Sequence, residues 1–300
     1  ANLISTLSVT LALLPDIRTA NFRFDSDLWK RMLQYSLPLL ILGIAGILDQ
    51  TVDKIIFPFL FEDKAYAASQ LGIYGACFKI SMVMMMFTQA FRYAYEPFIF
   101  AQYKDKDSKE AYAEAMKYFV IFSLLIFLGM VFYLDLLKFL IRSDYWEGLR
   151  VVPIVLFSYL FQGIFFNLSL WYKLTDKTYY GAIISIIGSV VVLTINILFV
   201  PIFSYMASAW ASFACYFVMM LISYFLGQKY MPIKYDLKTM GIYSAIALTL
   251  YGISLMIKTS STGLNLVFNT ILLIFFVLYL IKHDLPLENI PVVNRLFKKI

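Results

Sequence analysis

Residues 71–103, LGIYGACFKISMVMMMFTQAFRYAYEPFIFAQY, form a long apolar run that carries three charged side chains, Lys79, Arg92 and Glu96. A helix needs about 20 apolar residues to cross a bilayer, and a charge near its centre costs a few kcal/mol. Such a charge persists where it faces protein or water instead of lipid. The run therefore predicts a membrane-spanning helix with one face directed away from the lipid.

The preceding apolar run, residues 33–61, has the same character, because it contains Asp49, Gln50, Asp53 and Lys54. Two neighbouring spans that both carry charges indicate the wall of a polar cavity. In a chain that is otherwise apolar, such a cavity is typical of a transport protein.

The composition supports a membrane protein throughout the chain. Of its 300 residues, 61% are hydrophobic and 15% are charged, and the mean hydropathy is +0.77. Soluble domains contain about 25% charged residues. Two cysteines without metal or redox spacing and a single histidine, His283, leave few ligands for a metal site. The sequence predicts no cofactor and no metal.

Eight apolar runs are long enough to span a bilayer, and none alternates like a barrel strand. They cover residues 33–61, 71–102, 117–137, 149–172, 179–200, 206–227, 239–257 and 265–282. Residues 1–15, ANLISTLSVTLALLP, read as the end of a helix whose upstream part is missing. The predicted fold class is all-α, a polytopic transmembrane helical bundle.

The connections between these runs differ in charge. Lys and Arg are concentrated in alternate connections, at 16–31, 103–117, 173–178 and 229–238, and in the C-terminal tail. An excess of Lys and Arg in short connections marks the cytoplasmic side. This bias accounts for the formal charge of +6 without nucleic acid as a partner, and it orients every predicted span.

With this orientation, residue depth follows from the helical rise of about 1.5 Å per residue. Asp53 lies roughly 11 Å and Lys79 about 12 Å below the outer surface, so we expect an ion pair between them. The pair either serves the cavity or only holds two helices together. Asp49 and Asp53 share a helix face and either bind a cation or proton or neutralise Lys54 and Lys79.

Arg92 and Glu96 are also four residues apart, with Gln89 on the same side, so they can pair within the helix. Arg92 lies some 30 Å below the outer surface, near the cytoplasmic interface, where its side chain either reaches lipid headgroups or faces the cavity. The planar guanidinium suits phosphate oxygens, and two or three cations facing one cavity suit a diphosphate. The connections are too short for a catalytic domain, and we predict no enzyme.

Five stretches of the chain resemble a known family. They are LPLLILGIAGILDQTVDKIIFPFLF (37–61), residues 71–102, AMKYFVIF (115–122), YWEGLRVVPIVLFSYLFQGIFFNLSLWYKLTDKT (145–178) and PIFSYMASAWASFACYF (201–217). Together they resemble the polysaccharide flippases of the multidrug/oligosaccharidyl-lipid/polysaccharide exporter superfamily, in particular those from surface-polysaccharide clusters of Gram-negative bacteria.

The resemblance implies two six-helix lobes around a central cavity in the bacterial inner membrane, and this chain corresponds to the C-terminal portion. Its implied parts are the end of a helix (1–15), a cytoplasmic inter-lobe loop (16–32), the second lobe (33–228), two extra helices (229–283) and a basic tail (284–300). With the first lobe missing, we expect this chain to be inactive alone.

The implied activity is transport of undecaprenyl-diphosphate-linked oligosaccharide by alternating access. The implied partners are this lipid-linked substrate, membrane lipids, and polysaccharide synthesis and polymerase proteins. Candidate substrate-binding residues are Lys79, Arg92, Lys54 and Gln89, and candidates for ion coupling or structural pairing are Asp49, Asp53 and Glu96. The alternatives are a cation-coupled multidrug exporter of the same superfamily and a non-transporting membrane scaffold.

Overall fold

The structure is a computed structural model that describes residues 2–15, 24–102, 108–257, 259 and 261–284. Every regular element in these ranges is a helix. The long ones are α1 (Asn2–Ala12), α3 (Ser26–Ile56), α4 (Lys64–Gln102), α5 (Ser108–Phe132), α7 (Val152–Leu168), α9 (Tyr179–Phe203), α10 (Tyr205–Tyr230), α11 (Leu237–Met256) and α12 (Thr262–His283). The short ones are η1 (Phe57–Phe59), α6 (Leu134–Leu137), η2 (Lys138–Leu140), η3 (Ser143–Val151) and α8 (Leu170–Leu174).

Eight helical segments within these ranges are long and apolar enough to cross a membrane. They coincide with the eight predicted runs, so the predicted all-α, multi-pass membrane fold is confirmed.

One predicted boundary, the start of α3, is displaced by helix capping. The Asp25 carboxylate accepts hydrogen bonds from the backbone N–H groups of Asp27 and Leu28, at 2.9 and 3.0 Å. This cap satisfies free donors at the helix start, so α3 begins at Ser26 and takes in residues 26–32, which we expected in the inter-lobe loop. Residues 16–23 of that loop and 285–300 of the predicted tail lie outside the described residues.

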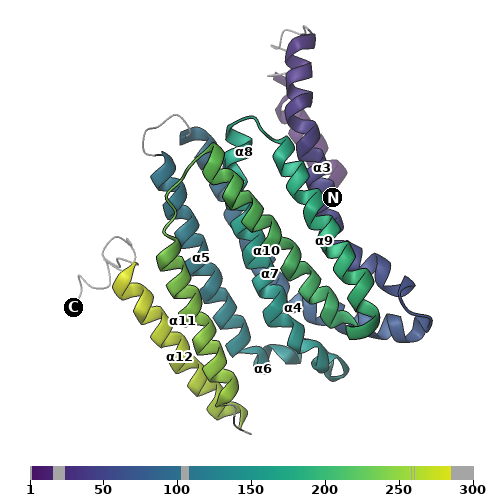
Figure 1. The fold of residues 1–300 in the computed structure, drawn as a ribbon, viewed down its shortest axis with the longest axis vertical. Coiled ribbons are helices and arrows are strands. Elements are labelled where there is room, and N and C mark those ends of the chain that lie inside the picture. Colours follow the sequence, from purple (N-terminus) through teal and green to yellow (C-terminus); the bar gives the residue numbers. More distant parts are fainter. Residues whose placement is uncertain (1, 16–23, 103–107, 258, 260, 285–300) are drawn as a thin grey trace.

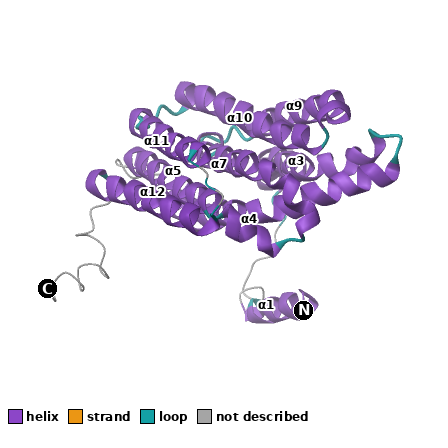
Figure 2. Cartoon of the chain, turned by 90° about the horizontal axis from the view of Figure 1, so that it is seen from below, coloured by secondary structure: helices purple, strands orange, loops and turns teal. Residues whose placement is uncertain are grey.

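Helix α7 lies at the centre of the bundle (Figure 1). It packs against α4, α5 and α10; α9 packs against α10, and α3 packs against α9. On the opposite side, α11 and α12 pack against α5. Seen from below, α1 lies apart from the other helices (Figure 2). The charged helices α3 and α4 are therefore joined to the bundle through α9 and α7, away from the α11–α12 hairpin.

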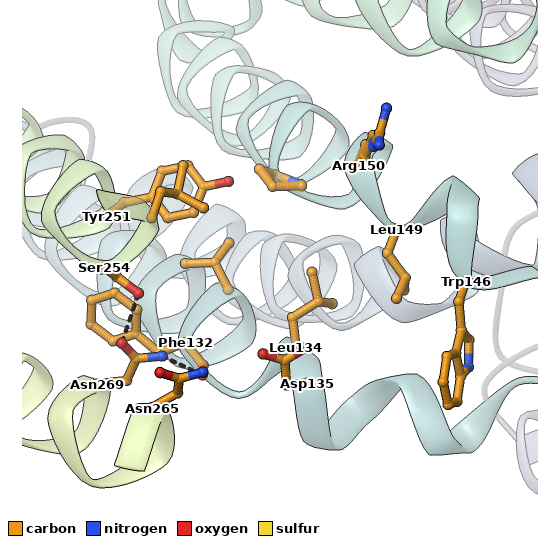
Figure 3. A pocket seen from close by; sticks show the side chains of 13 residues that line it. Phe132, Leu134, Asp135, Trp146, Leu149, Arg150, Tyr251, Ser254, Asn265 and Asn269 are labelled. Carbon is orange, nitrogen blue, oxygen red and sulfur yellow. Dashed lines mark hydrogen bonds between the residues drawn. The ribbon is translucent and has the colours of Figure 1, made fainter. Parts of the chain in front are cut away.

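The α11–α12 hairpin is attached to α5 at both ends. At one end, the Asn269 amide donates a 2.9 Å hydrogen bond to the carbonyl of Phe132, where α5 stops (Figure 3). At the other end, Lys117 Nζ lies 2.8 Å from Asp284 Oδ1, just after α12. Between transmembrane helices such polar contacts add to van der Waals packing. The hairpin is thus part of the described bundle.

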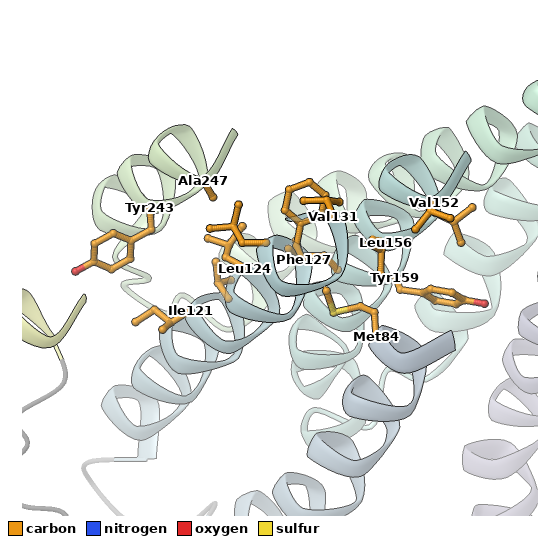
Figure 4. Packing of buried hydrophobic residues seen from close by; sticks show 14 of the residues in the cluster. Met84, Ile121, Leu124, Phe127, Val131, Val152, Leu156, Tyr159, Tyr243 and Ala247 are labelled. Atoms are coloured by element: carbon orange, nitrogen blue, oxygen red, sulfur yellow. The ribbon is translucent and has the colours of Figure 1, made fainter. Parts of the chain in front are cut away.

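Aromatic and aliphatic side chains from α4, α5, α7 and α11 fill the middle of the bundle (Figure 4). Close approach between helices needs small residues, since lipid offers no hydrophobic drive for association. Gly163 of α7 shows this need, because a Cβ atom there would lie 2.0 Å from the Phe119 ring of α5. The packing holds α7 rigidly beside α4, which carries Arg92.

Candidate functional site

Two acidic residues of α3, Asp49 and Asp53, are deeply buried, and one oxygen of Asp49 has no hydrogen-bond partner among the described residues. Asp49 and Asp53 are each 2% exposed. The Ser189 hydroxyl of α9 donates a 2.7 Å hydrogen bond to Asp49 Oδ1. Asp49 Oδ2 is inaccessible and has no hydrogen-bond partner among the described residues. A buried carboxylate oxygen without a partner is costly, so this atom indicates a position for a proton, a cation or a water molecule.

A small cavity adjoins Asp49, between α3, α4, α7 and α10. It is lined by Asp49, Gln50, Phe78, Val155, Ser158, Tyr159, Ser212 and Tyr216, and its volume is about 10 Å³. Roughly this much space holds one water molecule. The hydroxyls of Tyr159 and Tyr216 have no partner in the described part of the chain either. Carboxylate and hydroxyl oxygens are ligands of hard cations, so the cavity suits one small cation or a proton-carrying water.

The predicted ion pair between Asp53 and Lys79 is wrong. Asp53 Oδ1 lies 3.5 Å from Lys54 Nζ and accepts a 2.8 Å hydrogen bond from the Lys54 backbone N–H. Lys79 is exposed. The two residues have matching depth, but Phe78 is the one that faces α3, with its ring centre 4.1 Å from Lys54 Nζ. One residue further along a helix is a rotation of about 100°, which directs Lys79 elsewhere.

Lys54 is bound within this group and is not a free cation. Its Nζ donates a 2.7 Å hydrogen bond to the carbonyl of Gln50 and lies over the Phe78 ring. One third of its side chain is exposed. The positive charge of Lys54 therefore neutralises the negative charge of Asp53, and neither residue is left with a charge that a phosphate would neutralise.

The pairing of Arg92 with Glu96 that their spacing allows is not formed either. Glu96 Oε1 forms an ion pair with Lys173 Nζ of α8. Arg92 forms no ion pair with a described residue, and its buried Nε has no hydrogen-bond partner there. Its guanidinium carbon instead lies 4.7 Å from the ring centre of Phe166 on α7, in a cation–π contact. Arg92 is thus a half-buried cation whose charge has no acidic partner in the part of the chain that the structure describes.

Sequence reasoning missed Lys173 as a site residue. The sequence places Lys173 among the basic residues of the connection 173–178, on the same predicted side as the end of α4, and no local pattern indicates its contact with Glu96. Gln89, one turn before Arg92, has a buried Oε1 atom without a hydrogen-bond partner among the described residues. The end of α4 that carries Arg92 therefore has unsatisfied polar groups that a ligand can use.

The predicted site residues form two groups, one around Asp49 and Asp53 on α3 and one around Arg92 and Glu96 on α4. Lys79 belongs to neither. The expectation that two or three of these cations face one cavity stays a prediction. A cavity of about 310 Å³ lies elsewhere, between α5, η3 and the α11–α12 hairpin (Figure 3), and none of the predicted site residues lines it.

Comparison with known proteins bears on the family and the fold. Residues 64–198 match the model of the MatE family, which belongs to the superfamily that the sequence resembles. A solved structure described as "Lipid II flippase MurJ, inward closed conformation" superposes with a TM-score of 0.60 at 14% sequence identity, covering 93% of this chain and 60% of that chain. The chain has a MurJ-like fold. No curated protein matches it significantly.

The MurJ-like fold agrees with the multi-pass membrane topology. The chain spans 60% of the length of that flippase, and an identity of 14% carries the fold alone. The MatE match covers α4 to α9, a range that includes Arg92, Glu96 and Lys173 and excludes Asp49 and Asp53. The role of each residue is argued below from its own contacts.

Proposed function

We propose that this chain is part of a flippase that moves a lipid-linked oligosaccharide across the bacterial inner membrane by alternating access. The substrate class is a polyprenyl diphosphate carrying a sugar unit, as in undecaprenyl-diphosphate-linked oligosaccharides for surface polysaccharide synthesis. The MatE match and the MurJ-like fold support a transporter of this superfamily.

One observation carries the substrate class: Arg92 is a half-buried cation in a spanning helix, and no described residue is its acidic partner. An unpaired charge at this depth is costly unless something offsets it. A guanidinium binds two phosphate oxygens at once in a fixed geometry. Its location near the cytoplasmic end of α4 matches the side from which a newly made lipid-linked sugar is loaded.

The decisive experiment replaces Arg92 by Ala and by Lys in the intact native protein and measures surface polysaccharide and membrane abundance. We expect R92A to abolish the polysaccharide while the protein stays in the membrane, and R92K to retain part of the activity. Lys109→Ala, an exposed residue of α5 on the same side, is the matched control. Normal polysaccharide in R92A would show that Arg92 only reaches lipid headgroups.

The cavity at Asp49 supports ion coupling as part of the same proposal. Its free carboxylate oxygen and the neighbouring tyrosine hydroxyls suit a single small cation or a proton. Asp49→Asn keeps the shape and removes the charge, so we expect transport to become insensitive to the gradient of the coupling ion. Transport that still follows a sodium or proton gradient in this variant would exclude Asp49 from coupling.

The same cavity favours a second candidate function, a cation-coupled drug exporter of the same superfamily. A cationic drug needs an acidic site and no basic one. In that case D49N would abolish resistance to a lipophilic cation such as ethidium, and R92A would leave it unchanged. The flippase proposal expects no ethidium efflux in any variant.

A further inference from the structure

Lys173 is a second cation at the cytoplasmic end of α4, and its position is held from two sides. Its Nζ contacts Glu96 Oε1, and 15% of the Lys173 side chain and 27% of the Glu96 side chain are exposed. The Tyr35 hydroxyl of α3 donates a 3.3 Å hydrogen bond to the Lys173 backbone carbonyl. The short helix α8 therefore presents this ammonium group to α4 in a fixed place.

Among the described residues, Glu96 at this end of α4 pairs with Lys173, and Arg92 has no acidic partner. Arg92 and Glu96 are four residues apart on the same helix, and such residues share a face. Phe166, under the guanidinium of Arg92, lies on α7, which leads directly into α8 and Lys173. Two cations, Arg92 and Lys173, thus lie at this end of α4, and the Glu96 carboxylate pairs with Lys173 and not with Arg92. The two positive charges can therefore bind an anion that carries more than one negative charge.

We propose that Glu96 holds the place of a phosphate when the site is empty. The diphosphate of the lipid-linked substrate displaces Glu96 from Lys173 and binds between Lys173 and Arg92. This inference rests on the proposed flippase function and adds to it a second phosphate-binding residue and a competing acid. A diphosphate outcompetes Glu96 because it brings at least two negative charges, whereas an ordinary phospholipid phosphate brings one and has to compete with the carboxylate on equal terms.

The test is equilibrium binding of farnesyl diphosphate to the purified intact protein in detergent. We expect K173A to weaken binding about tenfold, since one charge-assisted hydrogen bond is lost. We expect E96Q to tighten binding several-fold, because the competitor loses its charge while Lys173 keeps its own. Lys234→Ala, an exposed cytoplasmic lysine, is the control and should bind as the wild type does.

The double variant E96Q/K173A should bind as weakly as K173A, since Glu96 acts through Lys173. A purely structural ion pair predicts that K173A and E96Q change binding in the same direction, because both break the same contact. That result, or wild-type affinity in K173A, overturns the inference. Thermal unfolding of the ligand-free variants checks that each one is folded, and the opposite signs of the two affinity changes cannot come from unfolding.

Further arms separate the sources of phosphate. Inorganic diphosphate should compete with farnesyl diphosphate, and farnesyl monophosphate and phosphatidylglycerol should compete much less. If phosphatidylglycerol competes equally well, the site binds a bilayer headgroup and the inference is wrong. If the wild-type protein binds no farnesyl diphosphate, both the proposed flippase function and this inference are refuted. If the wild-type protein binds it and the affinity is unchanged in K173A and E96Q, only this inference is refuted.

Discussion

Replacing Lys54 by Met tests the account of the buried charges on α3. The substitution leaves Asp53, which is 2% exposed, without its ion pair at 3.5 Å, while the hydrogen bond from the Lys54 backbone N–H at 2.8 Å is kept. Methionine keeps the apolar stem of the lysine in contact with Phe78. The change therefore isolates the loss of the positive charge.

The expected cost follows from the burial of each partner. Removing one member of a buried ion pair costs about 3–5 kcal/mol because the other charge stays buried. One third of the Lys54 side chain is exposed. We therefore expect K54M to lower the free energy of unfolding by about 3 kcal/mol, at the lower end of that range. Asp53→Asn should cost only about 1 kcal/mol, because Lys54 retains its hydrogen bond to the Gln50 carbonyl and its contact with Phe78.

The assay is equilibrium unfolding of the intact protein in mixed micelles of a mild detergent and SDS, with both single variants and the double variant. We expect the double variant D53N/K54M to be more stable than K54M, since no buried charge is left unpaired. A larger loss in D53N than in K54M would refute the reasoning, because it would mean that the lysine is the more costly group to leave unpaired. Additive losses would show that the two residues do not interact.

Two further predictions concern packing. Gly163→Ala should destabilise the bundle by about 1–3 kcal/mol, since the new methyl group would lie 2.0 Å from the Phe119 ring. The control is Gly241→Ala, because no atom lies within 4 Å of the new Cβ there. Equal unfolding midpoints for the two variants would contradict the packing argument. Lys117→Met should lower the free energy of unfolding by about 1–2 kcal/mol and increase hydrogen exchange in α12, because the ion pair with Asp284 at 2.8 Å holds the end of that helix. Unchanged hydrogen exchange in α12 would show that the ion pair does not hold it.

The spans could be predicted from sequence because a bilayer imposes a simple requirement on each segment separately. About 20 apolar residues must follow one another, and the helix must satisfy its own backbone hydrogen bonds. Neither condition depends on neighbouring helices. The ends were less certain, since caps such as Asp25 extend a helix beyond its apolar part. The prediction of α3 from residue 33 missed its first two turns for this reason.

The partners of the charged residues could not be predicted in the same way. Depth follows from the rise along one helix, and on depth alone Asp53 and Lys79 matched. Pairing also needs the rotation of each helix about its axis, and packing with other helices sets that rotation. Phe78 turns toward Lys54, which leaves Lys79 exposed. The partner of Glu96 is Lys173, which lies 77 positions further along the chain. No local sequence pattern links the two residues.

The sequence by itself therefore determined the class of the protein, the number and order of its membrane-spanning helices, and which of them carry charges, because these follow from hydropathy and length within each segment. Only the tertiary structure decided which charges are balanced and which are not. Asp49 and Arg92 are left with unsatisfied polar atoms because the helices packed against them direct Ser189 to one carboxylate oxygen and Lys173 to Glu96. That distribution comes from contacts between distant segments, which composition and spacing do not encode.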